Sequence, residues 1–328
     1  NGLALRAVCE AARAFGREDF RELAIRNGEF IQRELMRDGR VMRAHTAGVT
    51  RLPGYLDDHA AVGLGFLALW QLTFDRRWLD AARDVASAMT TWFWDDTAGA
   101  FFDTASDHEA LITRPREMTD NAVPAGSSLA AELLLQLAEL LHHADMRRRA
   151  NWLLETLAEP MSQHAAAFGH LLGVADMAVH GAIEVAIVGD PRSADFIALA
   201  SEAAHRYLPS LALAGGLPEQ TTGIALLEGR PMQGGRATAY VCRQYACDEP
   251  VTSAEALGEP GPTGAWLDLT IEDDGPGVEP TAVPHLFERF WRADTGTPAA
   301  RRGLGIGLSV VRGLVEAMGG SVQATPGP

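Results

Sequence analysis

The stretch YLDDHAAVGLGFLALWQLTFDRRWLDAARDVASAMTTWF, residues 55–93, decides the fold class of this chain. Its first half, residues 55–74, is apolar almost all round, which is typical of a helix that is buried on every side. In its second half, apolar side chains recur every three or four residues on a polar segment: Trp78, Ala81, Ala82, Val85, Met89 and Trp92. The stretch therefore predicts a hairpin made of a buried inner helix and a half-exposed outer helix.

The same contrast returns on both sides of this stretch. Residues 122–141 are apolar almost all round, and the residues that follow carry one apolar stripe, formed by Met146, Ala150, Leu153 and Leu157. Residues 5–31 also show helical spacing, with Gly16 between two runs. Repeated hairpins with an inner and an outer helix build ring-like arrays. We predict a mainly α fold in which residues 1–180 form an incomplete (α/α) toroid.

A smaller unit follows the helices. A β-branched run at residues 183–188 ends in Gly189-Asp190-Pro191 and lacks the glycine pattern of a dinucleotide site. A short helix at 193–207 and three strand-like pieces come next, at residues 211–214, 223–227 and 238–242. We predict a small α/β appendage over 181–250, a linker rich in proline and glycine over 251–265, and a new unit over 266–328.

Composition excludes several classes of function. The chain has 328 residues, 47% of them hydrophobic and 22% charged, which suits two globular domains. Its net charge of -15 repels phosphate backbones, so no nucleic-acid partner is expected. The longest apolar run, residues 61–72, is too short to cross a membrane. Because the first residue is Asn1 and it already lies in a helical pattern, we expect sequence to be missing upstream.

The number and spacing of the cysteines bear on the redox environment of the protein. Three cysteines, Cys9, Cys242 and Cys247, are too few and too scattered for a disulfide framework, which predicts a reducing, cytoplasmic environment. Cys242 and Cys247 do not have the spacing of a redox pair, and no second Cys or His pair completes a zinc site. They are predicted to be buried structural thiols.

The connectors before the inner helices are the place to look for a site. In such an array every inner helix starts at the same end, so residues 54–60 and 114–128 share one mouth, with residues 93–104 predicted as a β-hairpin beside them. Paired carboxylates can donate and accept protons around a sugar carbon or a glycosidic oxygen. The candidate catalytic residues are Asp57, Asp58, Glu117 and Asp120, and the aromatic rings that could stack on a sugar face are Tyr55, Phe101 and Phe102.

A structural interpretation competes with the catalytic one. Asp57, Asp58 and Asp120 stand where helix N-termini are capped, and Arg114 or Arg116 could pair with them. His59, on the first turn of a buried helix, could be a general base, but a hydrogen-bonded core histidine is the preferred interpretation.

Five ordered motifs carry a resemblance to a known family: GYLDDHA at 54–60, FWDDTAGAFFDT at 93–104, RPREMTDNAVPAGSS at 114–128, VAIVGDP at 185–191 and AYVCRQYACDEPVT at 239–252. Residues 1–257 resemble the C-terminal part of thioredoxin-domain proteins of the YyaL and spermatogenesis-associated protein 20 type. The resemblance implies a thioredoxin-like domain followed by a toroid of six hairpins, similar to N-acylglucosamine 2-epimerases and six-hairpin glycosidases, with a sugar-like small molecule as partner. This chain departs from the family by lacking the thioredoxin domain and by having fewer hairpins.

A second kind of pattern occupies the C-terminal unit. Residues 267–278, LDLTIEDDGPGV, alternate as a strand does and break at Gly275-Pro276-Gly277, where small residues let a ligand approach the backbone. The glycine-rich turn GLGIG at 303–307 precedes a helix with one apolar face, formed by Val311, Leu314, Val315 and Met318. The free amides at the start of that helix would suit a phosphate group.

Three segments of this unit, DDGPG, LFERFWR at 286–292 and the turn with its helix, resemble the G1, F and G2 boxes of the ATPase domain of sensor histidine kinases. The resemblance implies ATP as ligand, with Asp273 accepting a hydrogen bond from the adenine amino group. Gly275 and Gly277 would shape the pocket. The phosphate contacts of the lid would come from Gly303, Gly305 and Gly307, and its packing from Phe287 and Phe290.

The departures from the kinase pattern concern the metal and the phosphoacceptor. Residues 240–265 contain no asparagine, so the N box that holds magnesium is expected to be missing, and no H-E-L-R type phosphoacceptor helix occurs. Phosphoryl transfer depends on magnesium, so we expect weak nucleotide binding without autophosphorylation.

Three functional hypotheses follow from a chain that joins two incomplete proteins near residues 255–265. The first is an interaction or scaffold-like toroid fragment with a degenerate ATP-binding tail. The second is a carbohydrate-active isomerase or hydrolase, and the third is an ATP-binding module of two-component signalling.

Overall fold

The structure is a computed structural model that divides into two compact units, residues 1–260 and 261–328, each considered by itself. The residues that it describes are 1–109, 112–206, 208–243, 246–258, 278–288, 291, 307–317 and 321–324. The first unit is mainly α with a small mixed sheet, and a helix lies in the described part of the second.

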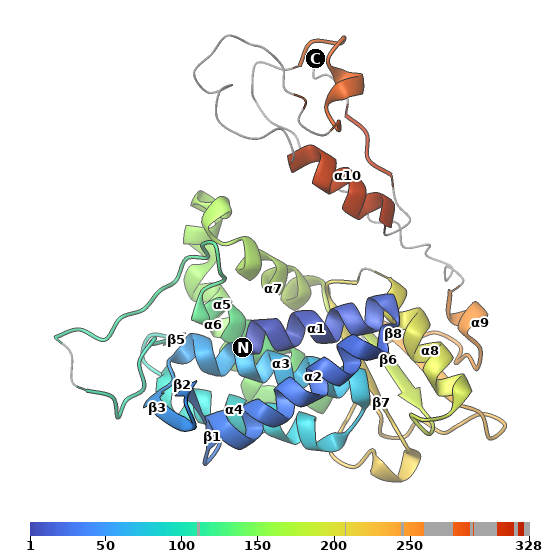
Figure 1. Cartoon of the computed structure of the whole chain (residues 1–328), viewed down its shortest axis with the longest axis horizontal. Helices are drawn as coiled ribbons and strands as arrows, with labels where there is room; N and C mark the ends of the chain where they lie inside the picture. The colour runs from blue at the N-terminus through green and yellow to red at the C-terminus, as the bar shows by residue number, and fades with distance from the viewer. Residues whose placement is uncertain are drawn as a thin grey trace. The chain divides into compact units, whose positions relative to one another are not determined.

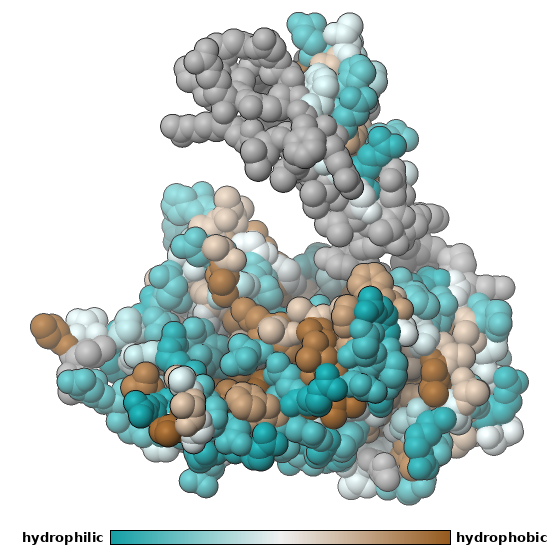
Figure 2. Space-filling view, viewed as in Figure 1, coloured by the Kyte–Doolittle hydropathy of each residue, from teal (hydrophilic) through white to brown (hydrophobic). Residues whose placement is uncertain are grey.

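The first unit is built from two layers of helices (Figure 1). The inner layer holds α1 (Gly2–Phe15), α3 (Leu56–Thr73), α5 (Gly126–Leu141) and α7 (Gly169–His180), each packed on the next. The outer layer holds α2 (Glu18–Phe30), α4 (Arg76–Phe93) and α6 (Ala144–Gln163), each packed on the inner helix before it. A one-turn π-helix, η1 (Ile31–Leu35), continues α2. The inner and outer helices predicted from apolar spacing are thereby confirmed, although α5 starts at Gly126 rather than at residue 122. Hydrophilic side chains cover most of the face of this unit that Figure 2 shows.

Neighbouring inner helices run in the same direction and touch near their starts. A Cβ atom on Gly126 of α5 would lie 2.9 Å from the backbone nitrogen of Asp57 in α3. A Cβ atom on Gly2 of α1 would lie 2.4 Å from the carbonyl carbon of Ala61. Because only glycine lets backbones approach this closely, these two positions bring the starts of α1, α3 and α5 together. Below them lies the core, in which Phe66 stacks on Trp78 at 5.6 Å between ring centroids.

Two small antiparallel sheets lie in the connectors. Strands β1 (Met36–Arg37), β2 (Arg40–Thr46) and β3 (Val49–Pro53) form a meander before α3. Strands β4 (Trp94–Asp95) and β5 (Ala100–Phe101) pair antiparallel, which confirms the predicted hairpin at residues 93–104.

The sheet of the appendage has the strand order β7-β6-β8-β9. Strand β6 (Ile183–Val188) pairs parallel with β7 (Leu211–Gly216) through the crossover helix α8 (Ala194–His205), and antiparallel with β8 (Thr238–Arg243). A 3-10 turn, η3 (Pro218–Gln220), follows β7. The strand predicted at 223–227 is wrong: these residues form turns, because Ile224, Leu226 and Leu227 are buried against the helical core instead of in a sheet.

The start of the predicted linker is packed. Val251 forms a β-bridge with Ala239, and the short helix α9 (Ala254–Gly258) packs on α8. Val251 and Leu257 lie against the apolar cluster of the sheet. Residues 251–258 therefore differ from the unpacked linker expected from their proline and glycine content.

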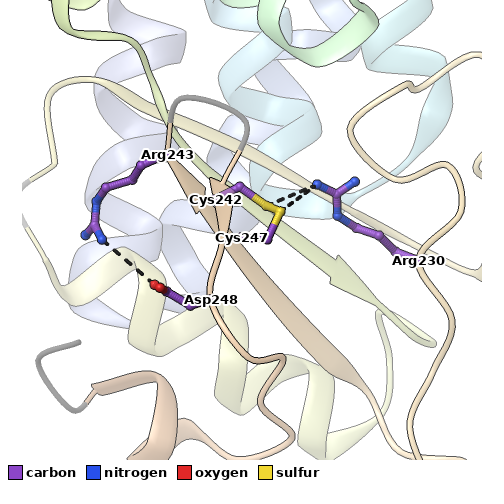
Figure 3. Close-up of a disulfide and its surroundings, with 5 residues drawn as sticks. All are labelled: Arg230, Cys242, Arg243, Cys247 and Asp248. Atoms are coloured by element: carbon purple, nitrogen blue, oxygen red, sulfur yellow. Dashed lines mark hydrogen bonds and ion pairs between the residues drawn. A yellow bond between two sulfur atoms is a disulfide. The ribbon is translucent and has the colours of Figure 1, made fainter. Parts of the chain in front are cut away.

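Cys242 and Cys247 form a disulfide (Figure 3). Strand β9 (Ala246–Cys247) folds back on β8 so that the two cysteines are direct partners in the antiparallel register. The expectation of two free buried thiols is wrong, because it considered sequence spacing and not the strand pairing that brings the sulfur atoms together. Because these two cysteines form a disulfide, they no longer support the prediction of a reducing compartment. Cys9 is a buried free cysteine.

The described part of the second unit contains a 3-10 turn, η4 (Val283–His285), and helix α10 (Gly307–Ala317). The predicted nucleotide residues Asp273, Gly275, Gly277, Gly303 and Gly305 lie outside the described residues, as does Phe290. Among the helices that the structure describes, none combines the length and apolar character needed to cross a membrane.

Candidate functional site

Asp58 caps helix α3. Its Oδ2 atom accepts a hydrogen bond from the backbone N–H of Tyr55 at 2.9 Å and one from Nη1 of Arg43 at 2.8 Å. Burial raises the pKa of Asp58, while these two donors act in the opposite direction. The geometry matches the capping interpretation, with Arg43 as the ionic partner in place of the expected Arg114 or Arg116.

Asp57 lies beside Asp58 and is more exposed. Its Oδ1 atom is 3.6 Å from Nη1 of Arg43, and its side chain keeps 54% of its accessible surface. The start of α5 touches its backbone at Gly126. Of the two neighbouring acids, Asp57 is therefore the one whose carboxylate a ligand could reach.

A further acid, Asp103, completes the group and was missed by the sequence reasoning. Its carbonyl oxygen accepts a hydrogen bond from Leu56 N–H at 2.9 Å, and its Oδ2 atom accepts one from Glu117 N–H at 2.8 Å. Burial, with the negative charges of Glu117 and Asp57, raises the pKa of Asp103 against the effect of that second hydrogen bond. Its position near the end of the motif FWDDTAGAFFDT could have identified it as a candidate from the sequence.

Glu117 has the opposite electrostatic environment. Its Oε1 atom accepts hydrogen bonds from Oγ1 of Thr119 at 2.6 Å and from the Thr119 N–H at 3.2 Å. These bonds lower the pKa of Glu117. Asp57, Asp103 and Glu117, which we call the mouth acids, thus include one carboxyl with a raised pKa and one with a lowered pKa.

Asp120 is engaged by the backbone. Its Oδ2 atom accepts hydrogen bonds from the N–H groups of His170 at 2.9 Å and Leu171 at 3.0 Å, and its Oδ1 atom accepts one from Ala125 N–H at 2.9 Å. One carboxylate therefore ties together the starts of α5 and α7. This arrangement favours a structural role over proton transfer.

The predicted aromatic rings are mostly covered. Phe101 is buried and packs on Trp94 at 4.8 Å between centroids, so it is not available for stacking on a ligand. The guanidinium carbons of Arg114 and Arg116 lie 3.8 and 3.9 Å from the centroid of the Phe102 ring. Arg114 also bonds the Thr104 carbonyl, and Arg116 pairs with Asp95. Of the three predicted rings, Tyr55 is the most exposed, at 39%.

His59 is a hydrogen-bonded core residue, as preferred. Its Nε2 atom accepts a hydrogen bond from Val41 N–H at 3.1 Å, and its Nδ1 atom is 2.7 Å from the Tyr55 carbonyl oxygen. Burial lowers the pKa of His59 to about 4. The ring is therefore neutral at pH 7 and joins strand β2 to helix α3.

A polar cluster joins three of the inner helices and was also missed. Arg6 of α1 donates to both carboxylate oxygens of Glu132 in α5, at 2.7 and 2.8 Å, and Nε2 of His170 in α7 lies 2.9 Å from the same group. Burial alone would raise the pKa of Glu132, but His170 and Arg6 lower it to about 2. In the sequence, Glu132 is a single charged residue within an apolar helix. Its partners Arg6 and His170 are 126 and 38 residues away, so the sequence does not show that they meet.

No metal site is found among the residues that the structure describes, where no group of three or more His, Cys, Asp or Glu side chains could hold an ion. Of the predicted phosphate contacts, Gly307 is described, and it is the first residue of α10. That position fits a phosphate contact at a helix start.

Comparison with known proteins separates the chain into two parts. Residues 246–328 match the family described as histidine kinase-, DNA gyrase B-, and HSP90-like ATPase. In this part the chain is 42% identical over 67 residues to sensor histidine kinase TrcS of Mycobacterium tuberculosis, covering 20% of this chain and 13% of the kinase. It is 44% identical over 61 residues to sensor protein RstB of Escherichia coli, covering 19% and 14%.

The larger part is similar to spermatogenesis-associated protein 20. The mouse protein is 27% identical over 267 residues, which cover 77% of this chain and 34% of that protein. The chain thus spans about a third of the length of this relative. Both resemblances seen in the motifs are confirmed, and the chain joins a segment similar to spermatogenesis-associated protein 20 to a segment similar to histidine kinase-type ATPases.

Proposed function

We propose that the C-terminal segment binds adenine nucleotide. The observation that carries this proposal is the family match over residues 246–328, supported by the two sensor kinases that are similar over this segment. Asp273 would accept the adenine amino hydrogen bond, and the turn that ends at Gly307 would face the phosphates. Because residues 240–265 contain no asparagine, binding without magnesium-dependent phosphoryl transfer is expected.

Titration of the full chain with a fluorescent ATP analogue tests this proposal. Wild-type protein should show saturable binding, and Asp273→Asn should weaken it at least ~10-fold, since the hydrogen-bond acceptor loses its charge and its amide NH2 can face the adenine amino group. Asp274→Asn makes the same chemical change one residue away and should bind as wild type does. Absence of binding, or equal effects of both substitutions, would reject the proposal.

A second candidate function belongs to the helical unit, which we propose to be the ring-forming part of a protein similar to spermatogenesis-associated protein 20. The mouth acids favour acid–base chemistry on a sugar-like molecule, because Asp103 and Glu117 have pKa values shifted in opposite directions. Asp103 would donate the proton and Glu117 would accept it, with Tyr55 as the stacking ring. This assignment moves the chemistry away from Asp58, which caps α3 and pairs with Arg43, and from Asp120, both of whose carboxylate oxygens accept backbone hydrogen bonds.

A screen of N-acylhexosamines and glycosides tests this second candidate. Turnover by the wild type should fall at least ~100-fold in Asp103→Asn, since general acid–base catalysis contributes about that much. Asp96→Asn, on an exposed loop of the same hairpin, provides the matched control. Turnover that is unchanged in Asp103→Asn, or absent from the wild type with every sugar, would leave the scaffold-like role as the function of this unit.

A further inference from the structure

A cavity of about 530 Å³ lies in the first unit, away from the mouth acids. It is bounded by the end of α1, the start of α2, the end of α3 and helix α8, and Figure 1 shows the end of α1 beside α8. Its lining includes four arginines, Arg13, Arg17, Arg21 and Arg192, but a single carboxylate, that of Glu18. Arginines therefore outnumber carboxylates among the residues that line the cavity.

Arg13 is the unusual member of this group. Its Nε and Nη1 atoms are shielded from solvent and have no hydrogen-bond partner in the described part of the chain, although the residue as a whole is only half-buried. Among the described residues no carboxylate forms an ion pair with it, and the nearby Glu10 bonds to Arg6 at 2.8 Å. Burial lowers the pKa of Arg13. A shielded cation without a partner costs free energy that a bound anion would recover.

The other three arginines have partners and are held at the rim. Arg17 pairs with Asp19 at 2.5 Å, and Arg21 pairs with Glu18 at 3.3 Å. Arg192 pairs with Asp190 at 3.1 Å. These pairs are exposed and each arginine is balanced by its carboxylate, so the attraction of an anion to the cavity is left mainly to Arg13.

Much of the rest of the wall is apolar, although Gln71, Thr73 and Ser201 also line the cavity. Phe74 and Phe196 meet edge to face at 5.0 Å between centroids, and both line the cavity. Ile197 and Ala200 of α8 extend the same surface. Inorganic phosphate alone would leave this surface in contact with water, whereas a ligand with an apolar body would cover it.

We propose that this cavity binds a small organic anion, whose phosphate or carboxylate group is held by Arg13 and whose apolar part lies against Phe74 and Phe196. A guanidinium group can donate charge-assisted hydrogen bonds to either head group. The site is separate from the proposed nucleotide segment and from the mouth acids, so it adds a second small-molecule site to the helical unit.

Calorimetric titration of the full chain at constant ionic strength tests the proposal with four probes: phenyl phosphate, benzoate, inorganic phosphate and benzyl alcohol. At least one of the two aromatic anions should bind, more tightly than inorganic phosphate, and neutral benzyl alcohol should not. The comparison of phenyl phosphate with benzoate identifies the preferred head group. If neither aromatic anion binds at millimolar concentration, the proposal is wrong.

Variants place the binding in this cavity. Arg13→Met should weaken the aromatic anion at least ~10-fold, because the charged hydrogen bonds are lost. Arg26→Met removes an exposed arginine of α2 that does not line the cavity, and it should bind as wild type does. Ser201→Trp places a bulky side chain in the cavity from α8 and should also weaken binding.

The outcomes separate this site from the nucleotide segment. Arg13→Met should fold at least as stably as the wild type without ligand, because it removes an uncompensated charge. Aromatic-anion binding that survives in both Arg13→Met and Ser201→Trp would overturn the proposal, and its loss in Asp273→Asn would assign the binding to the nucleotide segment instead. Loss of ATP-analogue binding alone would leave this proposal standing.

Discussion

At the residue scale, the carboxylates near the starts of the inner helices differ in the hydrogen bonds that they accept. Asp58 and Asp120 accept hydrogen bonds from backbone N–H groups at helix starts, which gives both carboxylates a structural role. The sequence alone predicts such caps, because an acid before an apolar helical run is a common helix start. It does not predict Arg43 as the partner or Asp103 as a neighbour, because strand pairing and loop contacts bring these residues close.

His59 yields a pH prediction at the same scale. Its pKa falls from 6.5 to about 4 on folding, so the unfolded chain binds more protons between these values. Stability should therefore be complete above pH 6.5 and decline as the pH falls toward 4, by roughly 3 kcal/mol from this residue. Urea unfolding of the wild type between pH 7 and pH 4 measures the slope.

The control for this prediction is a variant that cannot titrate. His59→Leu leaves the Val41 N–H and the Tyr55 carbonyl without their partner, so it should lose about 1 to 3 kcal/mol at pH 7. Its pH slope between 6.5 and 4 should be smaller than that of the wild type. His205→Leu, at an exposed position, should keep the wild-type slope. An equal slope in His59→Leu would show that other groups cause the acid sensitivity.

At the scale of elements, the inner and outer helices could be predicted because their apolar spacing differs. Helix α3 is buried over almost its whole length, whereas α4 buries one stripe. The meander of β1 to β3 could not be predicted, since its exposed strands show no clear alternation of polar and apolar residues. The turns at 223–227 looked like a strand because apolar residues also fill gaps beside helices.

Alanine should have opposite effects at two helical glycines, one at the contact between α3 and α5 and one in open space on α7. Gly126→Ala should destabilise the protein by about 1 to 3 kcal/mol, because the new Cβ atom would lie 2.9 Å from a backbone nitrogen. Gly173→Ala in α7 meets nothing within 4 Å and should stabilise it by up to ~1 kcal/mol. Thermal unfolding of both variants is the measurement. A neutral Gly126→Ala would mean that the two helices can move apart freely.

The pairing of β8 with β9 predicts the oxidation state of the cysteines. Denatured, non-reduced protein should take up one alkylating group, on Cys9, and reduced protein should take up three. Intact-mass measurement reads both values directly. Three groups without reductant would mean that Cys242 and Cys247 are thiols. Cys242→Ser should cost about 2 kcal/mol if the bond acts by restricting the unfolded chain over its short loop.

At the scale of the whole molecule, the chain contains two units whose patterns are independent. Their motifs are similar to those of two different kinds of protein, and this could be predicted because glycine-rich nucleotide motifs and repeated helical hairpins have unrelated periodicities. The boundary was harder to predict. Proline and glycine content suggested a linker from residue 251, but apolar Val251 and Leu257 continue the packing of the first unit.

Truncation tests this boundary. A fragment of residues 1–260 should fold with the melting temperature of the helical unit in the full chain and should not bind the ATP analogue. A fragment ending at residue 243 removes Val251, α9 and the disulfide partner Cys247. It should be less stable by about 4 to 6 kcal/mol, since two apolar side chains lose their burial and the disulfide is lost. Circular dichroism during heating distinguishes the two fragments. Equal melting temperatures would show that residues 246–258 contribute nothing to the fold.

The common direction of the inner helices has an electrostatic consequence. Because α1, α3, α5 and α7 begin at the same end, the partial positive charges of their first turns add there. The carboxylates at that end partly neutralise this positive charge. If the side chains there were neutral, the first turns of the four helices would repel one another. Any ligand that displaces one of these acids must supply negative charge in its place.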